Sequence, residues 1–544
     1  MRGSDAKGQL RTFLRSSIEE GGVRRPATAA VIDSVARSGG FSAPRRPLSA
    51  RELLALVLLL AAITAFYGLT MRPGDPWTDD FSEYVQEAKN ISEGAPYGKV
   101  EYVYHQDMWT PGPAAYPPVL PLLLAPVYRE FGLDLHPMKL MLLGFFVAAL
   151  VMIYMTFRNE LGPLGALGMV GIIGFNPFFW DFKDWVASDI PFLFLCYLAL
   201  YLTEVVVSRE VSGKRFIAYA ILTGLIVGAA CETRVVGIAM IPAVVAWGLI
   251  RYGKVLKSTA VMAIVCTTLE LIDAAKLHTF QATFLALQQG RGSSFVGTVL
   301  SFARYYIGST DRLWSNGHSG AWRMAFFALT VILMLVGMAV RHWRNLRVHD
   351  VFVLFYVPML INAQQARYLI PIIPLYLFYV ISGVQWVTRQ TPRRYGLAMA
   401  GGLAAVVALI YIADYRTIDL HHLPFGTASP EAQQLFAYIE GHAAPSDVVE
   451  FFAPRTLSLY TRRKSSVFPH IPPPTPADMQ AYFCRTGITY VVTSPWFRDQ
   501  ELLDFIAANR GAWSEPFANG RFDVYRLPEE GPGSACRTLT TEAR

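Results

Sequence analysis

The stretch Asp75–Gly132 reads DPWTDDFSEYVQEAKNISEGAPYGKVEYVYHQDMWTPGPAAYPPVLPLLLAPVYREFG, and the rest of the chain is organised around it. It follows a hydrophobic run that starts at Leu53, and it places Asp79 and Asp80 just beyond that run. It closes with an apolar segment, residues 116–132, which is shorter than the roughly 20 residues that a bilayer crossing needs. We therefore expect a polar loop outside the bilayer that ends in a helix lying at the membrane interface.

The composition is that of a polytopic α-helical membrane protein. The 544 residues are 53% hydrophobic and only 16% charged, whereas about a quarter of the residues of a soluble domain are charged. The net charge of +7 is modest, and the basic residues lie in short segments between apolar runs, as in cytoplasmic loops. This distribution argues against nucleic-acid binding.

The hydrophobic runs predict eleven transmembrane helices. The first, Leu53–Thr70, starts too far from residue 1 to be a cleaved signal and is expected to be a retained anchor. Its arginine-rich flank places the N-terminus in the cytoplasm. The other expected spans are 138–157, 163–181, 188–207, 216–232, 235–250, 255–272, 321–340, 350–363, 367–387 and 396–413.

Charge supports this path across the membrane. Loops on the cytoplasmic side carry basic residues, among them Arg158, Arg209, Lys214, Arg251, Arg341 and Arg393, and loops on the outer side carry Asp79, Asp80, Asp181, Asp184 and Asp189. The positive-inside rule is thus satisfied with a cytoplasmic N-terminus and an outer C-terminus. We expect a multi-pass protein of the cytoplasmic (inner) membrane.

Three regions follow from these patterns. Residues 1–51 are polar, basic and without hydrophobic periodicity, which predicts a disordered cytoplasmic segment. Residues 52–413 form the transmembrane region, with a first outer loop at 71–137. Residues 414–544 have the composition of a small α/β domain, expected on the periplasmic or extracellular side.

Local signals place the elements of this last region. Ser429 followed by Pro430 is a helix start, and helices are also expected at 476–487 and 499–509. Residues 447–453 and 488–493 read as strands, and Asn519-Gly520 reads as a hairpin turn. The region is long enough to form its own core.

Asp79 and Asp80 have two interpretations. Residues 79–94 have a helical pattern that places Asp80, Tyr84 and Ala88 on one face. An aspartate at the start of such a helix commonly caps its backbone N–H groups. A carboxylate held at the bilayer surface can instead accept a proton from an acceptor hydroxyl as a general base.

Charged residues near the outer ends of spans form a second group of candidates, namely Lys183, Asp189, Arg234 and Arg367. Ionisable groups in the hydrocarbon are costly and commonly functional, and arginine matches a phosphate through its bidentate donors. The alternative is that acid and base pair with each other between helices. The outer loop 273–320, with Lys276, His278, Arg291 and Arg304, could add to the site.

Other signals are weaker. Tyr116 and Tyr128 are expected at headgroup depth, and His105 and His278 are isolated. No phosphate loop, catalytic-triad order, HExxH or metal-ligand cluster occurs in the sequence, although a divalent cation is not excluded. Cys196, Cys231 and Cys266 read as small hydrophobes in apolar runs, and Cys484 and Cys536 could form a disulfide.

Taken in order, several segments resemble the GT-C superfamily of integral-membrane glycosyltransferases, whose bacterial members include protein mannosyltransferases and aminoarabinose transferases. These segments are D80-x-x-x-Y84-x-x-x-A88 with Gly94–Tyr97, then YPPVLPLLLAPVYREFG, SDIPFLFL, G224-x-x-x-G228 with Thr233-Arg234, and R367-Y368-L-I-P371. The resemblance covers residues 50–530.

The resemblance implies an inverting transferase that uses a polyprenyl-phosphate sugar. An acid of the first outer loop then deprotonates the acceptor, which makes Asp80 the expected base and Asp79 its rival. Arg367 and Arg234 match the basic residues that bind the lipid phosphate. Tyr84, Tyr116, Lys183, Asp189 and Tyr368 complete the expected substrate-binding set.

The chain departs from those relatives at two positions. They usually have Asp-Glu in the loop and often a histidine before the double proline, whereas this chain has Asp79-Asp80 and Tyr116. The sugar, a hexose or a pentose, and the acceptor, a periplasmic glycan, lipid or protein, therefore stay open. A flippase for a lipid-linked substrate and a non-catalytic scaffold are the alternatives.

Overall fold

The computed structural model describes residues 47–103, 115–211, 213, 215–276, 295–310, 313–314, 321–342, 346–360, 365–468, 475–495 and 499–527. Most of the predicted disordered segment lies outside this range, as do His105, His278, Arg291 and Cys536, and with Cys536 the predicted disulfide. The first described helix begins at Ala50, where Ser49 and Glu52 form a reciprocal capping box. It therefore starts within the last residues of the segment predicted to be disordered.

The described residues up to Tyr415 are mainly helical. The helices are α3 (Ala50–Leu69), α4 (Asp80–Glu93), α5 (Val119–Phe131), α6 (Leu135–Gly174), α7 (Pro177–Asp181), η1 (Phe182–Asp184), α8 (Asp189–Val211), α9 (Ile217–Cys231), η2 (Val235–Ala239), α10 (Met240–Tyr252), α11 (Lys257–Lys276), α13 (Phe295–Thr310), α14 (Ala321–His342), α15 (Val348–Met359), η5 (Ala366–Leu369), α16 (Ile373–Gln390) and α17 (Arg393–Tyr415).

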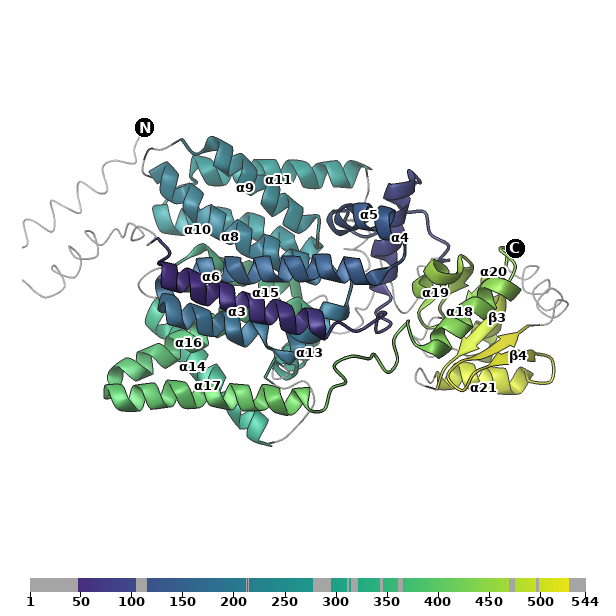
Figure 1. The fold of residues 1–544 in the computed structure, drawn as a ribbon. Helices are drawn as coiled ribbons and strands as arrows, with labels where there is room; N and C mark the ends of the chain where they lie inside the picture. Colours follow the sequence, from purple (N-terminus) through teal and green to yellow (C-terminus); the bar gives the residue numbers. More distant parts are fainter. Residues whose placement is uncertain are drawn as a thin grey trace, which may run out of the picture. The chain divides into compact units, whose positions relative to one another are not determined.

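This part has the character of a membrane protein, as predicted. Seven of its described helices are long and apolar enough to cross a bilayer, and α3, α6 and α8 run side by side with others as a bundle (Figure 1). Leu54 and Leu58 on α3 are each 60% exposed, which suits a surface that faces lipid rather than water. The count of eleven spans stays a prediction.

The longest helical element is interrupted by a backbone break. Helix α6 has 40 residues, about 60 Å at 1.5 Å per residue, which is twice the thickness of a hydrocarbon core. Gly162 has φ 73° and ψ 166° inside it, and Pro163 follows. Because proline cannot continue the hydrogen bonding of the preceding turn, the chain changes course between the predicted spans 138–157 and 163–181.

The predicted outer loop 273–320 is not one continuous loop. Helix α11 extends to Lys276, and the sixteen-residue helix α13 lies within the predicted loop. The sequence of α13 is mixed, with Arg304 and four aromatic residues among small ones, so it lacks the uniform apolar run by which spans were recognised. Its Tyr306 hydroxyl donates to the carbonyl of Gln365 next to η5 (3.3 Å).

The C-terminal part is an α/β structure. Its elements are α18 (Pro430–His442), β1 (Val448–Glu450), α19 (Pro454–Thr461), β2 (Lys464–Ser466), α20 (Pro476–Thr486), β3 (Ile488–Thr493), α21 (Gln500–Asn509), β4 (Ser514–Ala518) and β5 (Asp523–Arg526). The sheet order is β2-β1-β3-β5-β4, with β1 parallel to β2 and β3 and with β3, β5 and β4 antiparallel. The predicted hairpin and the predicted strand 488–493 are confirmed.

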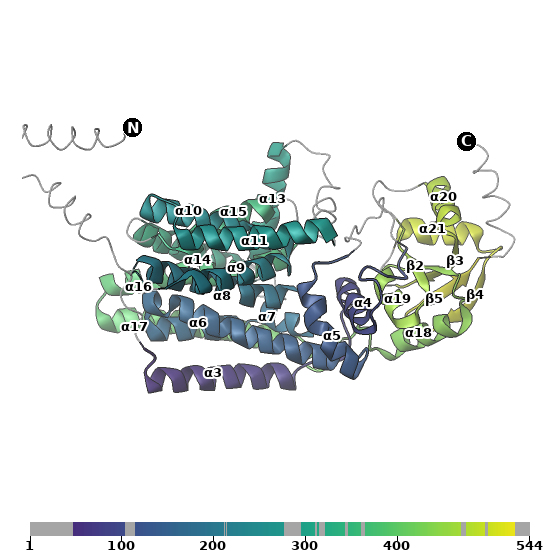
Figure 2. The same ribbon diagram turned by 90° about the horizontal axis from the view of Figure 1, so that it is seen from above.

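Helices cover both faces of this sheet (Figure 2). Val449 and Val492 point to the face where α18 and α19 pack, and Val448 and Val491 point to the face of α20 and α21. This is the alternation expected of a central strand. A register shift between Val448 and Val449 adds one residue to β3 at this point, as in a β-bulge.

The first outer loop supplies part of both of these cores. Trp77 is buried among Phe436, Phe451 and Phe522. Tyr102 is buried in the core on the opposite face and pairs with Ser465 as a parallel extension of the sheet edge. One large aromatic side chain of each core therefore comes from the loop, and the expectation that residues 414–544 can form a core by themselves stays a prediction.

Candidate functional site

Asp79 and Asp80 stand at the start of α4 but do not cap it. Asp79 occupies the N-cap position with φ 55°, and its carboxylate accepts no hydrogen bond from α4. Its Oδ1 accepts instead from the backbone N–H (3.0 Å) and the hydroxyl (3.2 Å) of Thr456. The capping interpretation is thus wrong for α4. The carboxylate caps the first turn of α19, where the N-cap residue Ala453 has no acceptor of its own.

Asp80 lies between two donors from distant segments. Its Oδ2 is 2.5 Å from Nη2 of Arg367, and the hydroxyl of Tyr116 donates to Oδ1 at 2.7 Å. Burial alone would raise the pKa of Asp80, but Arg367 and the Tyr116 hydroxyl together hold it below its usual value. The side chain keeps 20% of its surface exposed, so an ionised carboxylate remains accessible.

A second acid–base pair lies near the Asp80–Arg367 pair. Arg234 Nη1 is 2.8 Å from Asp189 Oδ1, and both side chains are buried. The Arg234 guanidinium carbon also lies 4.6 Å from the ring centroid of Tyr368, a cation–π distance. The pairing of acid with base that the sequence left open thus occurs at both arginines.

Tyrosines and one serine join the two pairs. The Tyr84 and Tyr116 rings lie 4.6 Å apart, and the Tyr84 hydroxyl is 2.8 Å from Ser188 Oγ. Arg234 donates to the same Ser188 oxygen at 3.2 Å. The structure therefore brings seven predicted site residues into one connected cluster, namely Asp80, Tyr84, Tyr116, Asp189, Arg234, Arg367 and Tyr368.

Lys183 belongs to a different network. Its Nζ lies 2.6 Å from Asp184 Oδ2 and 3.7 Å from the Trp180 ring centroid. Asp184 also accepts from Nε of Arg72 at 2.6 Å. Lys183 therefore pairs with the buried carboxylate of Asp184 and has no direct contact with Asp80 in the described structure.

Arg455 is a member of the cluster that sequence reasoning missed. It lies in the first turn of α19, beside the Thr456 that Asp79 caps. Its Nη1 donates to the Tyr116 hydroxyl at 3.2 Å, and its Nε is 3.5 Å from Glu83 Oε2. Nothing in the sequence around Arg455 marks it, because its neighbours in the chain read as ordinary strand and loop residues.

Two buried glutamates of α4 were also missed. Burial raises the pKa of Glu83 to about 7 against the opposing charge of Arg455, and burial raises that of Glu87 well above its usual value. Glu87 accepts from the backbone N–H of Tyr116 at 2.6 Å. Asp80, Glu83 and Glu87 have helical spacing. The sequence therefore contained a signal that places both glutamates on the same helix face as Asp80.

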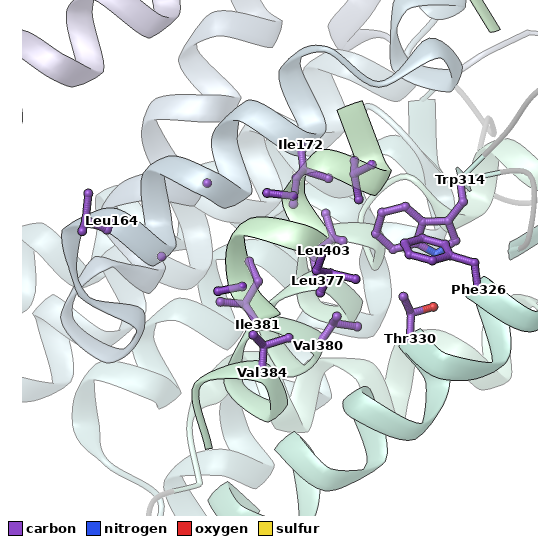
Figure 3. A pocket seen from close by; sticks show the side chains of 15 residues that line it. Leu164, Ile172, Trp314, Phe326, Thr330, Leu377, Val380, Ile381, Val384 and Leu403 are labelled. Carbon is purple, nitrogen blue, oxygen red and sulfur yellow. The ribbon is translucent and has the colours of Figure 1, made fainter. Parts of the chain in front are cut away.

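Two other features lie apart from this cluster. An apolar pocket is lined by Trp314 and by residues of α6, α14, α16 and α17, among them Leu164, Phe326, Leu377 and Leu403 (Figure 3). None of the carboxylates or arginines above lines it. Among the described residues, the one group of side chains placed to share a metal ion is Cys231, Cys266 and Glu270, so the carboxylates of α4 form no such group.

Comparisons with known proteins point to one fold. No protein-family model matches the chain, and no curated protein matches its sequence. Among solved structures, ArnT from Cupriavidus metallidurans bound to undecaprenyl phosphate is similar with a TM-score of 0.54 at 14% identity, over 89% of this chain and 99% of that one.

A second solved structure agrees. The oligosaccharyltransferase AglB from Archaeoglobus fulgidus, in complex with an inhibitory peptide and a dolichol-phosphate, is similar with a TM-score of 0.55 at 12% identity, over 89% of this chain and 75% of that one. Both are membrane glycosyltransferases of the GT-C superfamily. The resemblance seen in the sequence is thereby confirmed at the level of architecture, and this chain has the GT-C fold.

Proposed function

We propose that this protein is an inverting glycosyltransferase that moves a sugar from a polyprenyl-phosphate donor to an acceptor hydroxyl. The observation that carries the proposal is the accessible, ionised Asp80 carboxylate, held by Arg367 in a cluster with the buried Arg234. A base and two cationic groups are what this transfer needs at one place. The undecaprenyl phosphate on ArnT and the dolichol-phosphate on AglB support the donor class.

The proposed step moves one proton and breaks one bond. The acceptor oxygen attacks the anomeric carbon of the sugar while Asp80 takes the proton of the acceptor hydroxyl. The bond between the anomeric carbon and the phosphate oxygen breaks, and polyprenyl phosphate leaves with the electron pair. Arg367 and Arg234 stabilise the charge that develops on that phosphate, through N–H donors fixed in a site of low dielectric constant.

The Asp80–Arg367 pair also provides for donor binding. A guanidinium has five N–H donors, and Arg367 commits its Nη2 to Asp80 and its Nε to Gln365 at 2.6 Å. A donor phosphate would draw part of the positive charge away from Asp80. The carboxylate then becomes a stronger base at the stage at which the acceptor must be deprotonated.

The orientation of the site in the membrane is part of the same proposal. The charge distribution of the loops supports a cytoplasmic N-terminus and an outer face that carries α4, α5 and the C-terminal α/β part. We propose that the reaction occurs at the outer face of the bacterial cytoplasmic membrane. The lipid-linked donor then comes from the bilayer, and a glycan, lipid or protein acceptor comes from the aqueous side.

Lipid mass spectrometry of a deletion strain tests this function. The strain is complemented with the wild type, Asp80→Asn or Asp79→Asn. We expect the deletion and Asp80→Asn strains to accumulate one polyprenyl-phosphate sugar, since removing the base costs at least about 100-fold in rate. Asp79→Asn is the matched control, because its amide oxygen can still accept from Thr456, and it should clear the donor.

Three outcomes would contradict the proposal. If Asp80→Asn clears the donor as well as the wild type does, Asp80 is not the base. If wild-type protein in vesicles moves a lipid-linked sugar across the bilayer without releasing free polyprenyl phosphate, the protein is a flippase and not a transferase. Unchanged lipids in the deletion strain would favour a non-catalytic scaffold.

A further inference from the structure

Two of the cysteines that read as small hydrophobes meet in the folded chain. Cys231 is the last residue of α9, and Cys266 lies in α11. Their sulfur atoms are 3.8 Å apart, and both side chains are buried. Glu270 lies one turn beyond Cys266 on the same face of α11, and one ligand atom from each of the three residues lies within 4.8 Å of the others.

The sulfur–sulfur distance fits two ligands of one metal ion. Zinc–sulfur bonds are about 2.3 Å long and tetrahedrally arranged, which places two coordinating sulfurs about 3.8 Å apart. A disulfide has its sulfurs about 2.05 Å apart. The observed 3.8 Å is a contact between two thiols, and it equals the spacing that joint coordination requires.

Helix packing holds the two cysteines at this separation. Gly224 and Gly228 face α11, and a Cβ on Gly224 would lie 3.0 Å from the backbone oxygen of Met262 and 2.9 Å from Cβ of Val265. Only residues without a side chain permit so close an approach. The glycines bring the outer turn of α9 against Cys266 and Glu270.

The charge around the cysteines also favours a cation. One oxygen of Glu270 is buried without a hydrogen-bond partner in the described structure, and the charges of Glu270 and Asp273 act on the nearby Glu232. No lysine or arginine of the described residues forms a salt bridge with Glu232 or Glu270. A carboxylate oxygen buried without a partner is costly unless it coordinates a metal.

We propose that Cys231, Cys266 and Glu270 bind one Zn²⁺ ion that ties α9 to α11. Two thiolates and a carboxylate are ligands that zinc prefers, and Asp273, Glu232 or a water completes the tetrahedron. Binding releases the two thiol protons to solvent and involves no change of oxidation state. This proposal does not depend on the transferase activity.

The ion would steady the segment that carries Arg234. Glu232 follows Cys231 directly, and its carbonyl accepts from the backbone N–H of Val119 at the start of α5 (3.1 Å). Arg234 follows two residues later and reaches Asp189. A metal bound at Cys231 would therefore restrict the movement of residues 231–234. These residues lead from the end of α9 to Arg234 and are hydrogen-bonded to α5.

Metal analysis of the purified full-length protein tests the site. The protein is expressed with zinc present, purified in detergent without chelator, and assayed by mass spectrometry for metals. We expect about one zinc ion per chain in the wild type and a loss of at least about tenfold in occupancy in Cys231→Ser and Cys266→Ser, since a structural zinc needs its full ligand set. Cys196→Ala is the matched control, because Cys196 is a third buried cysteine outside the group, and it should keep the metal.

Measurements on the wild type keep the test independent of variant folding. Exchange of zinc for cobalt should produce the intense sulfur-to-cobalt charge-transfer absorption of thiolate ligation. Cys231 and Cys266 should react with an alkylating reagent only after a chelator removes the metal. Wild-type protein without zinc, cobalt absorption without thiolate bands, or thiols that react only after chemical reduction would each overturn the proposal, the last by showing a disulfide.

Discussion

Asp79 and Asp80 have opposite electrostatic environments although they are neighbours in the chain. Asp80 is held ionised by Arg367 and Tyr116, whereas burial raises the pKa of Asp79 to about 6. Asp79 is occupied with the first turn of α19, and Asp80 faces the arginines of the cluster. The sequence could not predict this difference in pKa, because the two residues are of the same type and the difference depends on which cations lie near each carboxylate.

The difference predicts the acid limb of the pH profile. A base must be ionised, so its activity falls as the pH drops below its pKa. With Asp80 as base, kcat/KM should stay level from about pH 8 down to about pH 5, and with Asp79 it should decline through about pH 6. The profile is measured with wild type and with Asp79→Asn, which should have the same acid limb. A midpoint near pH 6 that disappears in Asp79→Asn would assign the base to Asp79.

The contact between Arg455 and Glu83 leads to a prediction about stability, in which one substitution destabilises the protein and a second partly reverses the loss. Arg455→Ala leaves the buried Glu83 without its cation and the Tyr116 hydroxyl without its donor, and it should cost about 1–3 kcal/mol. Thermal unfolding in detergent measures the loss. Adding Glu83→Gln should recover part of it at a pH at which Glu83 is ionised, because the glutamine carries no charge; the pKa of Glu83 is about 7 with Arg455 in place. A double variant no more stable than Arg455→Ala would show that the pair does not carry this stability.

At the scale of the elements, local sequence signals were reliable where the interaction is local. Ser429 caps α18 by accepting from the backbone N–H of Ala432, and the hairpin turns at Asn519-Gly520 between β4 and β5. Helix α19 and strand β2 were missed, because eight- and three-residue elements have too few positions to display a period. Strand β2 is placed by pairing with β1 and with the outer loop.

The packing of α9 on α11 leads to a paired prediction. Gly224→Ala sets a methyl group against the rigid backbone of Met262, whereas Gly228→Ala meets the flexible end of Leu269, 2.4 Å from its Cδ1. We expect Gly224→Ala to lower stability by about 1–3 kcal/mol and Gly228→Ala by less, since overpacking is relieved only where a neighbour can move. Thermal unfolding in detergent compares the two, and equal losses would contradict the account.

At the scale of the whole molecule, the predicted first outer loop and the C-terminal α/β part share two hydrophobic cores. Trp77 enters one core and Tyr102 the other, and the backbone N–H of Thr427 donates to the carbonyl of Asp75 at 2.9 Å. Gly74, at φ 74°, lies so close to Ala428 that a Cβ would be 2.6 Å from its backbone nitrogen. Contacts with the C-terminal part therefore hold the loop in place both before and after Asp80.

This interdependence predicts a long-range effect of a single substitution. Trp77→Ala empties a large volume in the core between the sheet and α18, and it should cost about 3–5 kcal/mol. Limited proteolysis should then cut the C-terminal part, and activity should fall because α19 no longer supports Asp79 and Arg455. Trp77→Phe, which keeps an aromatic ring, should be milder. Unchanged protease resistance in Trp77→Ala would show that residues 414–544 are stable without the loop.

The sequence by itself determined the class of protein and most of the elements, because hydrophobic runs, caps and turns act over a few residues. It also pointed to Asp80, Arg234 and Arg367 through their place beside apolar runs. Only the tertiary structure decided that Asp79 caps a distant helix, that Arg455 reaches Glu83, and that Cys231 meets Cys266. These contacts join segments far apart in the chain, and burial and charge act on them only after folding has brought the segments together.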